Sequence, residues 1–359
     1  MKIALIGMPK SGKTTIFNAL TGLNKEVGAF TSQDTETHHG IVEVHDARIQ
    51  WLSDQYKPKK TIYATIEYMD FSGITSSSDE HEGFSSQILA GVRTADALAL
   101  VLRNFDDSII ADIVGPVDVL KEISMLEEEM LISDQILVEK RLEKIELSYK
   151  RGQKTPQLQI EEKALRSILT ELEQSRPIRL MDLHEEEEKA VRGFQFLTQK
   201  PILIILNSDE AHYRQDAILT KNIEALYPFV EFAGKFEMEL AGLSPEEAKM
   251  FMDDMGIEDS ARDLLTKFSY QTLGYVSFFT VGPDEVRAWT ITNHENAVDA
   301  AGKIHSDLAR GFIRAECFHY DDLHQYGSEK ALREKGLFRL EGKNYIVKDG
   351  DILNIRFSV

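Results

Sequence analysis

The sequence has little cysteine, no long apolar run and no surplus of basic residues. Cys317 is the single cysteine among 359 residues, so neither an intrachain disulfide nor a cysteine-ligated metal cluster can form. The longest apolar runs, at 97–102 and 201–206, are far shorter than the roughly 20 residues that cross a membrane as a helix. The apolar start that ends at Gly7 is too short for a signal-peptide core. These absences predict a protein of the reducing cytoplasm with no membrane partner.

The charge balance limits the partners that the chain can have. There are 41 Lys and Arg residues against 60 Asp and Glu residues, which gives a formal net charge of −19. An open basic surface is therefore not expected, so we expect no DNA partner, and any RNA contact must use local patches. With 42% hydrophobic and 28% charged residues, the composition is that of a globular chain, and its length suits two or three domains.

Residues 1–116 and 200–273 have the pattern of one α/β domain. Short apolar segments alternate with helical ones, and we predict strands at 2–6, 65–70, 97–102 and 202–206. Alternation of this kind is typical of a mostly parallel sheet with helices on its faces. The predicted fold class is therefore α/β.

Residues 117–199 interrupt this pattern with a strongly charged segment. Apolar residues recur there at spacings of three and four, in two runs that are separated by Gly152 and Pro156. The runs contain Leu131, Val138, Leu142 and Ile145, then Leu165, Ile168 and Leu172. This spacing predicts an antiparallel helical hairpin or coiled coil inserted into the sheet domain. Two ordinary surface helices packed on the sheet are the alternative.

Residues 274–359 change the pattern again and predict a separate α+β domain of roughly 85 residues. Segments 286–292, 344–347 and 352–357 have the character of strands, and 348–351, Lys-Asp-Gly-Asp, is typical of a turn between the last two. Residues 297–310 are predicted to form a single helix.

The run from Gly7 to Thr14, Gly-Met-Pro-Lys-Ser-Gly-Lys-Thr, matches the phosphate-loop pattern between a strand and a helix. Glycines let backbone N–H groups turn inward around phosphates. Lys13 adds positive charge at the β- and γ-phosphates, which makes it a catalytic candidate, and the Thr14 hydroxyl ligates Mg²⁺. The nucleotide-binding candidates in this segment are Gly7, Pro9, Lys10, Ser11, Gly12, Lys13, Thr14 and Thr15.

Two further motifs follow predicted strands. Asp70 ends the second strand, where a carboxylate can hold Mg²⁺ through water, and Gly73 can then donate its N–H to the γ-phosphate as a second catalytic candidate. Asn207 and Glu210 belong to Asn-Ser-Asp-Glu, in the place where GTPases carry Asn-Lys-x-Asp. The longer Glu210 does not reproduce the guanine-specific pair of hydrogen bonds. Unpaired buried donors cost a few kcal/mol, which is enough to change base preference.

With these motifs in order, the chain resembles the Obg-like ATPase (YchF-type) family over essentially its whole length. Segment 7–21 is similar to the family's first motif, Asn207 and Glu210 to its Asn-x-x-Glu hallmark, and Ala233-Gly234-Lys235 to its last base-loop motif. The most specific similarity is to the family's TGS domain, at 279–282, 285–291, 300–307, 310–316, 339–345 and 349–351.

The resemblance implies a Ras-like P-loop domain with an inserted helical arm and a small α+β TGS domain. It also implies ATP hydrolysis with Mg²⁺ as cofactor, and association with ribosomes, ribosomal RNA or translation factors. Ala233, Gly234 and Lys235 become nucleotide-binding candidates on the same ground.

The chain departs from the family at some of these positions. Lys10 stands where the family usually has an Asn that can help to hold a potassium ion, so Lys10 either supplies its own cation or points to solvent. The family's Thr-Ile-Glu-Pro-Asn segment before the second strand is absent. Thr35 and Thr37 are candidates for the threonine that senses Mg²⁺, with Thr35 preferred as a metal ligand.

The residues around the expected catalytic water are apolar. Ile74 follows Gly73 and cannot orient water, and Ala111 stands where the family carries a histidine. Intrinsic hydrolysis is therefore expected to be slow. His81 could substitute for the histidine, but an exposed loop residue without a role is the simpler interpretation, so the water-orienting group stays unassigned.

Three functional hypotheses follow. The first is a switch that binds and slowly hydrolyses ATP, in which the nucleotide state repositions the arm and the C-terminal domain on a partner. The second is a GTP-preferring translational GTPase, against which the Glu210 motif argues. The third is a nucleotide-binding regulatory module whose hydrolysis has lapsed. Comparing ATP with GTP affinity separates the first two, and turnover separates both from the third.

Overall fold

A computed structural model describes residues 1–23, 37–71, 86–255 and 261–358. The chain divides into two compact units. Residues 2–40 and 67–262 form one, called here the P-loop unit, and residues 41–66 and 263–359 form the other with Met1, called the C-terminal unit. The C-terminal unit thus contains residues 41–66, which the sequence analysis had placed with the α/β domain.

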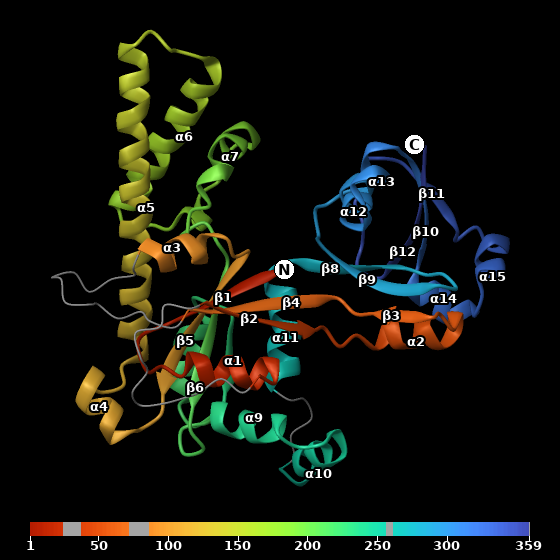
Figure 1. Cartoon of the computed structure of the whole chain (residues 1–359), viewed down its shortest axis with the longest axis horizontal. Coiled ribbons are helices and arrows are strands. Elements are labelled where there is room, and N and C mark those ends of the chain that lie inside the picture. The colour runs from red at the N-terminus through yellow and green to blue at the C-terminus, as the bar shows by residue number, and fades with distance from the viewer. Residues whose placement is uncertain (24–36, 72–85, 256–260, 359) are drawn as a thin grey trace. The chain divides into compact units, whose positions relative to one another are not determined.

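The P-loop unit is built on a six-stranded sheet with the order β2-β4-β1-β5-β6-β7 (Figure 1). β1 pairs in parallel with β4 and β5, β5 with β6, and β6 with β7. The mostly parallel α/β sheet is therefore confirmed. The strands are β1 (Lys2–Ile6), β2 (Thr37–Glu43), β4 (Thr65–Phe71), β5 (Ala97–Asn104), β6 (Ile202–Ser208) and β7 (Phe229–Phe232).

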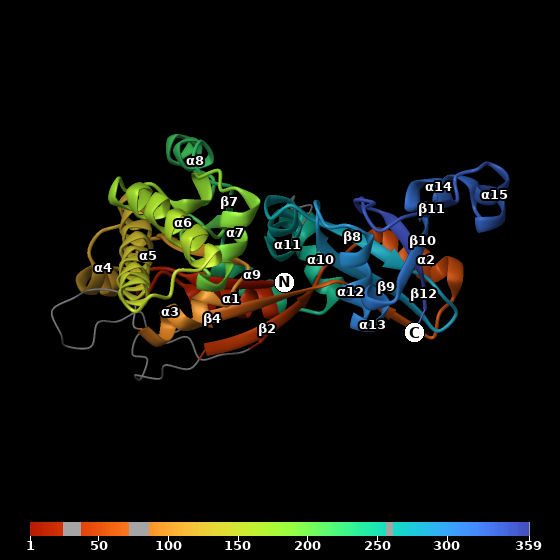
Figure 2. The same ribbon diagram turned by 90° about the horizontal axis from the view of Figure 1, so that it is seen from above.

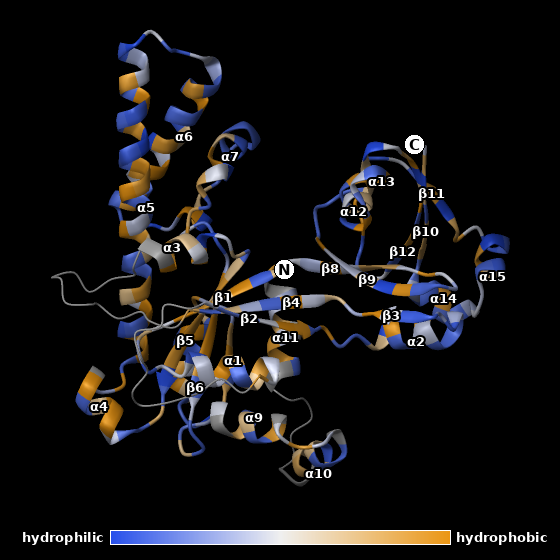
Figure 3. Cartoon of the chain, in the orientation of Figure 1, coloured by the Kyte–Doolittle hydropathy of each residue, from blue (hydrophilic) through white to orange (hydrophobic). Residues whose placement is uncertain are grey.

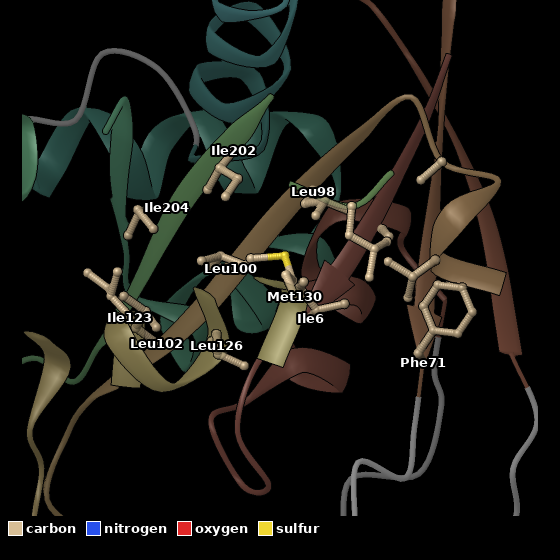
Figure 4. Close-up of a cluster of buried hydrophobic side chains, with 14 of the residues drawn as sticks. Ile6, Phe71, Leu98, Leu100, Leu102, Ile123, Leu126, Met130, Ile202 and Ile204 are labelled. Atoms are coloured by element: carbon tan, nitrogen blue, oxygen red, sulfur yellow. The ribbon is translucent and has the colours of Figure 1, made fainter. Parts of the chain in front are cut away.

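The central strands are apolar because helices cover both faces of the sheet. Every residue of β5 and β6 is buried, which is typical of central parallel strands (Figure 3). Even-numbered residues such as Ile6, Leu100 and Leu102 point to one face and meet Ile123 and Met130 of helix α5 (Val119–Lys150) (Figure 4).

The helices of this unit outside the arm are α1 (Lys13–Thr21), α3 (Ser86–Arg93), α4 (Ser108–Val114), α8 (Ala217–Glu224), α9 (Gly234–Ala241) and α10 (Pro245–Met255).

Two long helices, α5 (Val119–Lys150) and α6 (Pro156–Glu173), lie side by side in both views (Figures 1 and 2). The side chain of Thr155 caps α6 by accepting from the N–H of Leu158, and Pro156 takes the first helical position, where no N–H is needed. The two helices share a hydrophobic core of their own, distinct from the core on the sheet. This separate core favours the predicted hairpin over two helices packed on the sheet. Helix α7 (Glu185–Val191) and the short 3-10 turns Ile178–Leu180 and Arg192–Phe194 complete the arm.

The C-terminal unit has its own six-stranded sheet with the order β11-β10-β12-β8-β9-β3. Strand β3 (Lys60–Ile62) pairs in parallel with β9 (Glu285–Thr292), which is how residues 41–66 join this unit. The other strands are β8 (Tyr275–Thr280), β10 (Phe312–His319), β11 (Arg339–Glu341) and β12 (Asp351–Phe357). The helices are α2 (Ala47–Tyr56), α11 (Ala261–Thr272), α12 (Ala297–Ile304), α13 (Ser306–Arg310), α14 (Tyr320–Tyr326) and α15 (Glu329–Glu334).

Two predicted elements of this unit differ in the structure. Residues 344–347 form no strand, since Ile346 makes only an isolated bridge to Asn296. The predicted helix 297–310 is two helices, because His305 is extended and its side chain accepts from the N–H of Asp307 to cap the second one. Among the described residues, no helix has both the length and the apolar character required to cross a membrane.

Candidate nucleotide-binding site

The loop after β1 turns sharply at two residues with left-handed backbone. Lys10 has φ 64° and Gly12 has φ 91°. A β-carbon at Gly12 would stand 2.1 Å from the side-chain nitrogen of Asn207, and one at Gly7 would stand 2.3 Å from the carbonyl oxygen of Val101. The close packing of the loop therefore requires both glycines, and the left-handed backbone is a second reason for glycine at position 12.

Lys13 is the first residue of α1, and its ammonium group points back into the loop. Its Nζ donates to the carbonyl oxygens of Gly7 at 2.9 Å and Met8 at 3.0 Å. Burial lowers the pKa of Lys13 to about 8, although the carboxylates of Asp70 and Glu122 oppose the shift. A buried cation whose hydrogen bonds to the described residues go to neutral carbonyl groups gains from an incoming anion, so this position favours phosphate.

Thr14 and Asp70 meet as the sequence predicts for a magnesium site. The Thr14 hydroxyl donates to Oδ2 of Asp70 at 3.0 Å. Asp70 is fully buried, and its Oδ1 has no hydrogen-bond partner among the residues that the structure describes. Burial raises the pKa of Asp70, and Lys13 and the Thr14 hydroxyl oppose that shift. A buried carboxylate with one free oxygen beside a hydroxyl suits a Mg²⁺ ion whose remaining ligands are phosphate and water. Within the described residues, no group of three or more acidic, His or Cys side chains is arranged to hold a metal ion by itself.

Asn207 connects the three sequence motifs. Its side-chain Nδ2 donates to the carbonyl oxygen of Ser11 at 3.0 Å, and its Oδ1 accepts from the N–H of Gly234 at 3.3 Å. A β-carbon at Gly234 would stand 2.7 Å from that Oδ1, so the glycine is needed for this contact. The amide thus holds the phosphate loop, the end of β6 and the start of α9 together.

Comparison with known proteins places the chain in a family. A family model named YchF-GTPase_C, described as a protein of unknown function, matches residues 275–358, and the model for ferrous iron transport protein B matches residues 1–55. The chain is 36% identical to the ribosome-binding ATPase YchF of Bacillus subtilis, over 99% of this chain and 98% of the relative. It is 33% identical to the protein of that name from Escherichia coli O157:H7, over 100% and 99%.

The solved structure of the Schizosaccharomyces pombe YchF GTPase has the same fold. It aligns with a TM-score of 0.81 and 30% identity, over 99% of this chain and 97% of that one. The chain belongs to the YchF family. The family resemblance predicted from the sequence is therefore confirmed along the whole chain.

In this YchF-family chain Glu210, the candidate for base recognition, lies on a loop that hydrogen bonds from neighbouring residues hold in place. Glu210 is exposed and forms no hydrogen bond or ion pair with the described residues. The neighbouring Asp209 accepts from the N–H of Asp106 at 3.2 Å and from the N–H of His212 at 2.9 Å. Glu231 of β7 also binds this loop, a role that the sequence analysis missed because Glu231 belongs to no motif.

The structure describes the predicted site residues to different degrees. Thr35, Gly73, Ile74 and His81 lie outside the described residues. Ala233 precedes α9, Gly234 begins it and Lys235 is its second residue. Pro9 and Thr15 are half-buried in the loop and in α1. Thr37 begins β2, and Ala111 is exposed on α4.

Proposed function

We propose that the chain is a cytoplasmic, ribosome-associated NTPase that binds ATP in preference to GTP and hydrolyses it slowly. The observation that carries the proposal is the Asn207 bridge, because it joins a complete phosphate loop to the end of β6, from which the loop with Glu210 continues. The Bacillus and Escherichia relatives are named ribosome-binding ATPases, which supports the choice of substrate and partner.

The phosphate end of the site would act through positioning and charge. Lys13 would leave the carbonyl oxygens of Gly7 and Met8 for the β- and γ-phosphates, where its positive charge offsets the charge that develops during transfer. Thr14 and Asp70 would hold the magnesium ion, Thr14 directly and Asp70 through water. When bound, Mg²⁺ supplies neutralising charge between the β- and γ-phosphate oxygens.

The choice of base follows from the chemistry of Glu210. The aspartate of the GTPase motif accepts a pair of hydrogen bonds from guanine, and the longer Glu210 places its carboxylate differently and does not reproduce that pair. A carboxylate at this position can still accept a hydrogen bond from the exocyclic amine of adenine. The exposed and unpaired state of Glu210 leaves its carboxylate available to a base.

Binding of fluorescent ATP and GTP analogues in the presence of Mg²⁺ tests this function. We expect tighter binding of ATP, loss of both ligands in Lys13→Ala, and a reduced preference for ATP in Glu210→Asp. A clear preference for GTP in the unaltered chain would contradict the base assignment, and the chain would then be a GTPase. Turnover measured with and without ribosomes separates an active NTPase from a nucleotide-binding module without hydrolysis.

A further inference from the structure

Behind the base-recognition loop lies a row of polar side chains that spans three neighbouring strands. Asn104 ends β5, Ser208 ends β6 and Glu231 lies in β7. Asn104 and Ser208 are directly paired across their strands and are 8% and 4% exposed. Asn104 Nδ2 donates to the Ser208 hydroxyl at 2.8 Å, and that hydroxyl donates to Oε1 of Glu231 at 2.6 Å.

The second carboxylate oxygen of Glu231 holds the far end of the same loop. It accepts from the N–H of Arg214 at 3.0 Å. Arg214 has φ 56°, a left-handed conformation that is unfavourable for a residue with a side chain and needs support from its surroundings. Glu231 therefore binds residue 208 at the start of the loop and residue 214 at its end.

We propose that Glu231 is a positioning residue for recognition of the nucleotide base. Glu210 lies inside the segment that Glu231 closes, so its position depends on both ends of that segment. The inference rests on the proposed function, since it assigns a support to the loop that is proposed to read the base. Glu231 itself would not touch the nucleotide.

A carboxylate suits this position because both partners are donors. Each oxygen of Glu231 accepts one hydrogen bond, from a side-chain hydroxyl and from a backbone N–H. A glutamine offers a single acceptor oxygen, so Glu231→Gln keeps one of the two links, and Glu231→Ala keeps neither. The two variants should therefore be graded in effect.

The test uses the full chain and measures affinities for ATP, GTP and inorganic tripolyphosphate by competition with a fluorescent ATP analogue. Tripolyphosphate has no base, so the ratio of nucleotide affinity to tripolyphosphate affinity isolates base recognition. We expect Glu231→Ala to lower this ratio for the preferred nucleotide about tenfold, equivalent to about 1.4 kcal/mol. The ratio for Glu231→Gln should lie between those of the unaltered chain and Glu231→Ala. Ser208→Ala added to Glu231→Ala should cause little further loss, because both act through one link.

Glu224→Ala is the matched control, since Glu224 is exposed at the end of α8 and forms no hydrogen bond or ion pair through its side chain with the described residues. It should leave all three affinities unchanged. A ratio within about twofold of the unaltered chain in both Glu231 variants would overturn the proposal, as would an equal loss of tripolyphosphate affinity.

The same measurements test the proposed function separately from the role of Glu231. An unaltered chain that prefers GTP contradicts the assignment of ATP, yet the ratio measured with GTP still decides the role of Glu231. An unaltered chain that binds no nucleotide overturns both.

Discussion

Asn207 is the residue on which three parts of the site depend, because each end of its buried amide has a backbone partner. Asn207→Ala leaves the carbonyl of Ser11 and the N–H of Gly234 without their partner. Each unpaired buried group costs about 1–3 kcal/mol, so we expect the free energy of unfolding to fall by about 2–4 kcal/mol in denaturant titrations.

The same variant should weaken ATP, GTP and tripolyphosphate together, since the phosphate loop itself loses a support. This pattern differs from that of Glu231→Ala, which affects only the base-dependent part. Asn222→Ala, at an exposed position of α8, is the control and should change neither stability nor binding. Unchanged tripolyphosphate affinity in Asn207→Ala would contradict this account.

Lys13 makes nucleotide binding depend on pH. With a pKa of about 8, the amine of the nucleotide-free chain is neutral at pH 9, and a bound triphosphate must draw a proton back to it. We therefore expect ATP affinity to weaken above pH 8 and to approach a roughly tenfold loss per pH unit. Calorimetry at pH 9 in two buffers with different heats of ionisation should show proton uptake, and its absence would contradict the prediction.

Raising the pH has the opposite effect on folding stability: it weakens ATP binding but stabilises the nucleotide-free fold through Lys13. The lysine of the unfolded chain keeps its proton up to its usual pKa of 10.5, whereas the folded one has a pKa of about 8. Between these values the unfolded state binds more protons, so raising the pH stabilises the folded nucleotide-free chain through this group. Saturating ATP should remove the effect, because bound phosphate keeps Lys13 charged in the folded state.

At the scale of the elements, the buried carboxylate of Asp134 links helix α5 of the arm to α3 and to the segment just before β6. Asp134 of α5 is fully buried, accepts from Arg93 of α3 at 2.8 Å, and accepts from the N–H of Leu197 and of Thr198 just before β6. Asp134→Ala should destabilise the chain by about 3–5 kcal/mol, since it removes the carboxylate partner of a partly buried guanidinium and the acceptor of two backbone N–H groups.

Glu139→Ala on the exposed side of the same helix is the control for helix propensity and charge. It should change the free energy of unfolding by less than about 0.5 kcal/mol. Equal effects of the two variants in urea titrations would show that Asp134 has no anchoring role.

How far an element can be predicted depends on where its stabilising contacts come from. The central strands were placed within two residues at most, because burial on both faces requires continuous apolar runs. The helix break at His305 was missed, because it results from a side-chain cap that periodicity does not show. The predicted strand at 344–347 is wrong for a similar reason: the segment has the character of a strand, but among the described residues its only β-pairing is the bridge between Ile346 and Asn296.

At the scale of the whole molecule, long-range pairing is what the sequence does not show. Lys60 pairs with Glu285, and no local pattern indicates that residues 41–66 join the C-terminal unit. The same limit applies to the candidate site. The phosphate loop and Asp70 could be predicted, because motifs and strand ends mark them in the sequence. The support from Glu231 could not, because it depends on which strands become neighbours.

The net charge of −19 determines how the whole chain approaches the proposed ribosomal partner, whose RNA is a polyanion. Local contacts must form against long-range repulsion, and salt screens that repulsion. Raising ionic strength from 0.01 to 0.15 M shortens the Debye length from about 30 to about 8 Å, so we expect the association rate constant with purified ribosomes to rise. A basic RNA-binding protein would slow down over the same range.

Stopped-flow association at fixed Mg²⁺ and ATP concentrations would measure this dependence. The double variant Glu186→Gln, Glu188→Gln removes two charges from helix α7 at positions that form no ion pair with the described residues. It should bind faster at low salt and respond less to added salt. An association rate that falls steadily as salt is added would instead mean that a cationic patch governs the approach, because screening slows association only where the dominant force is attraction between opposite charges.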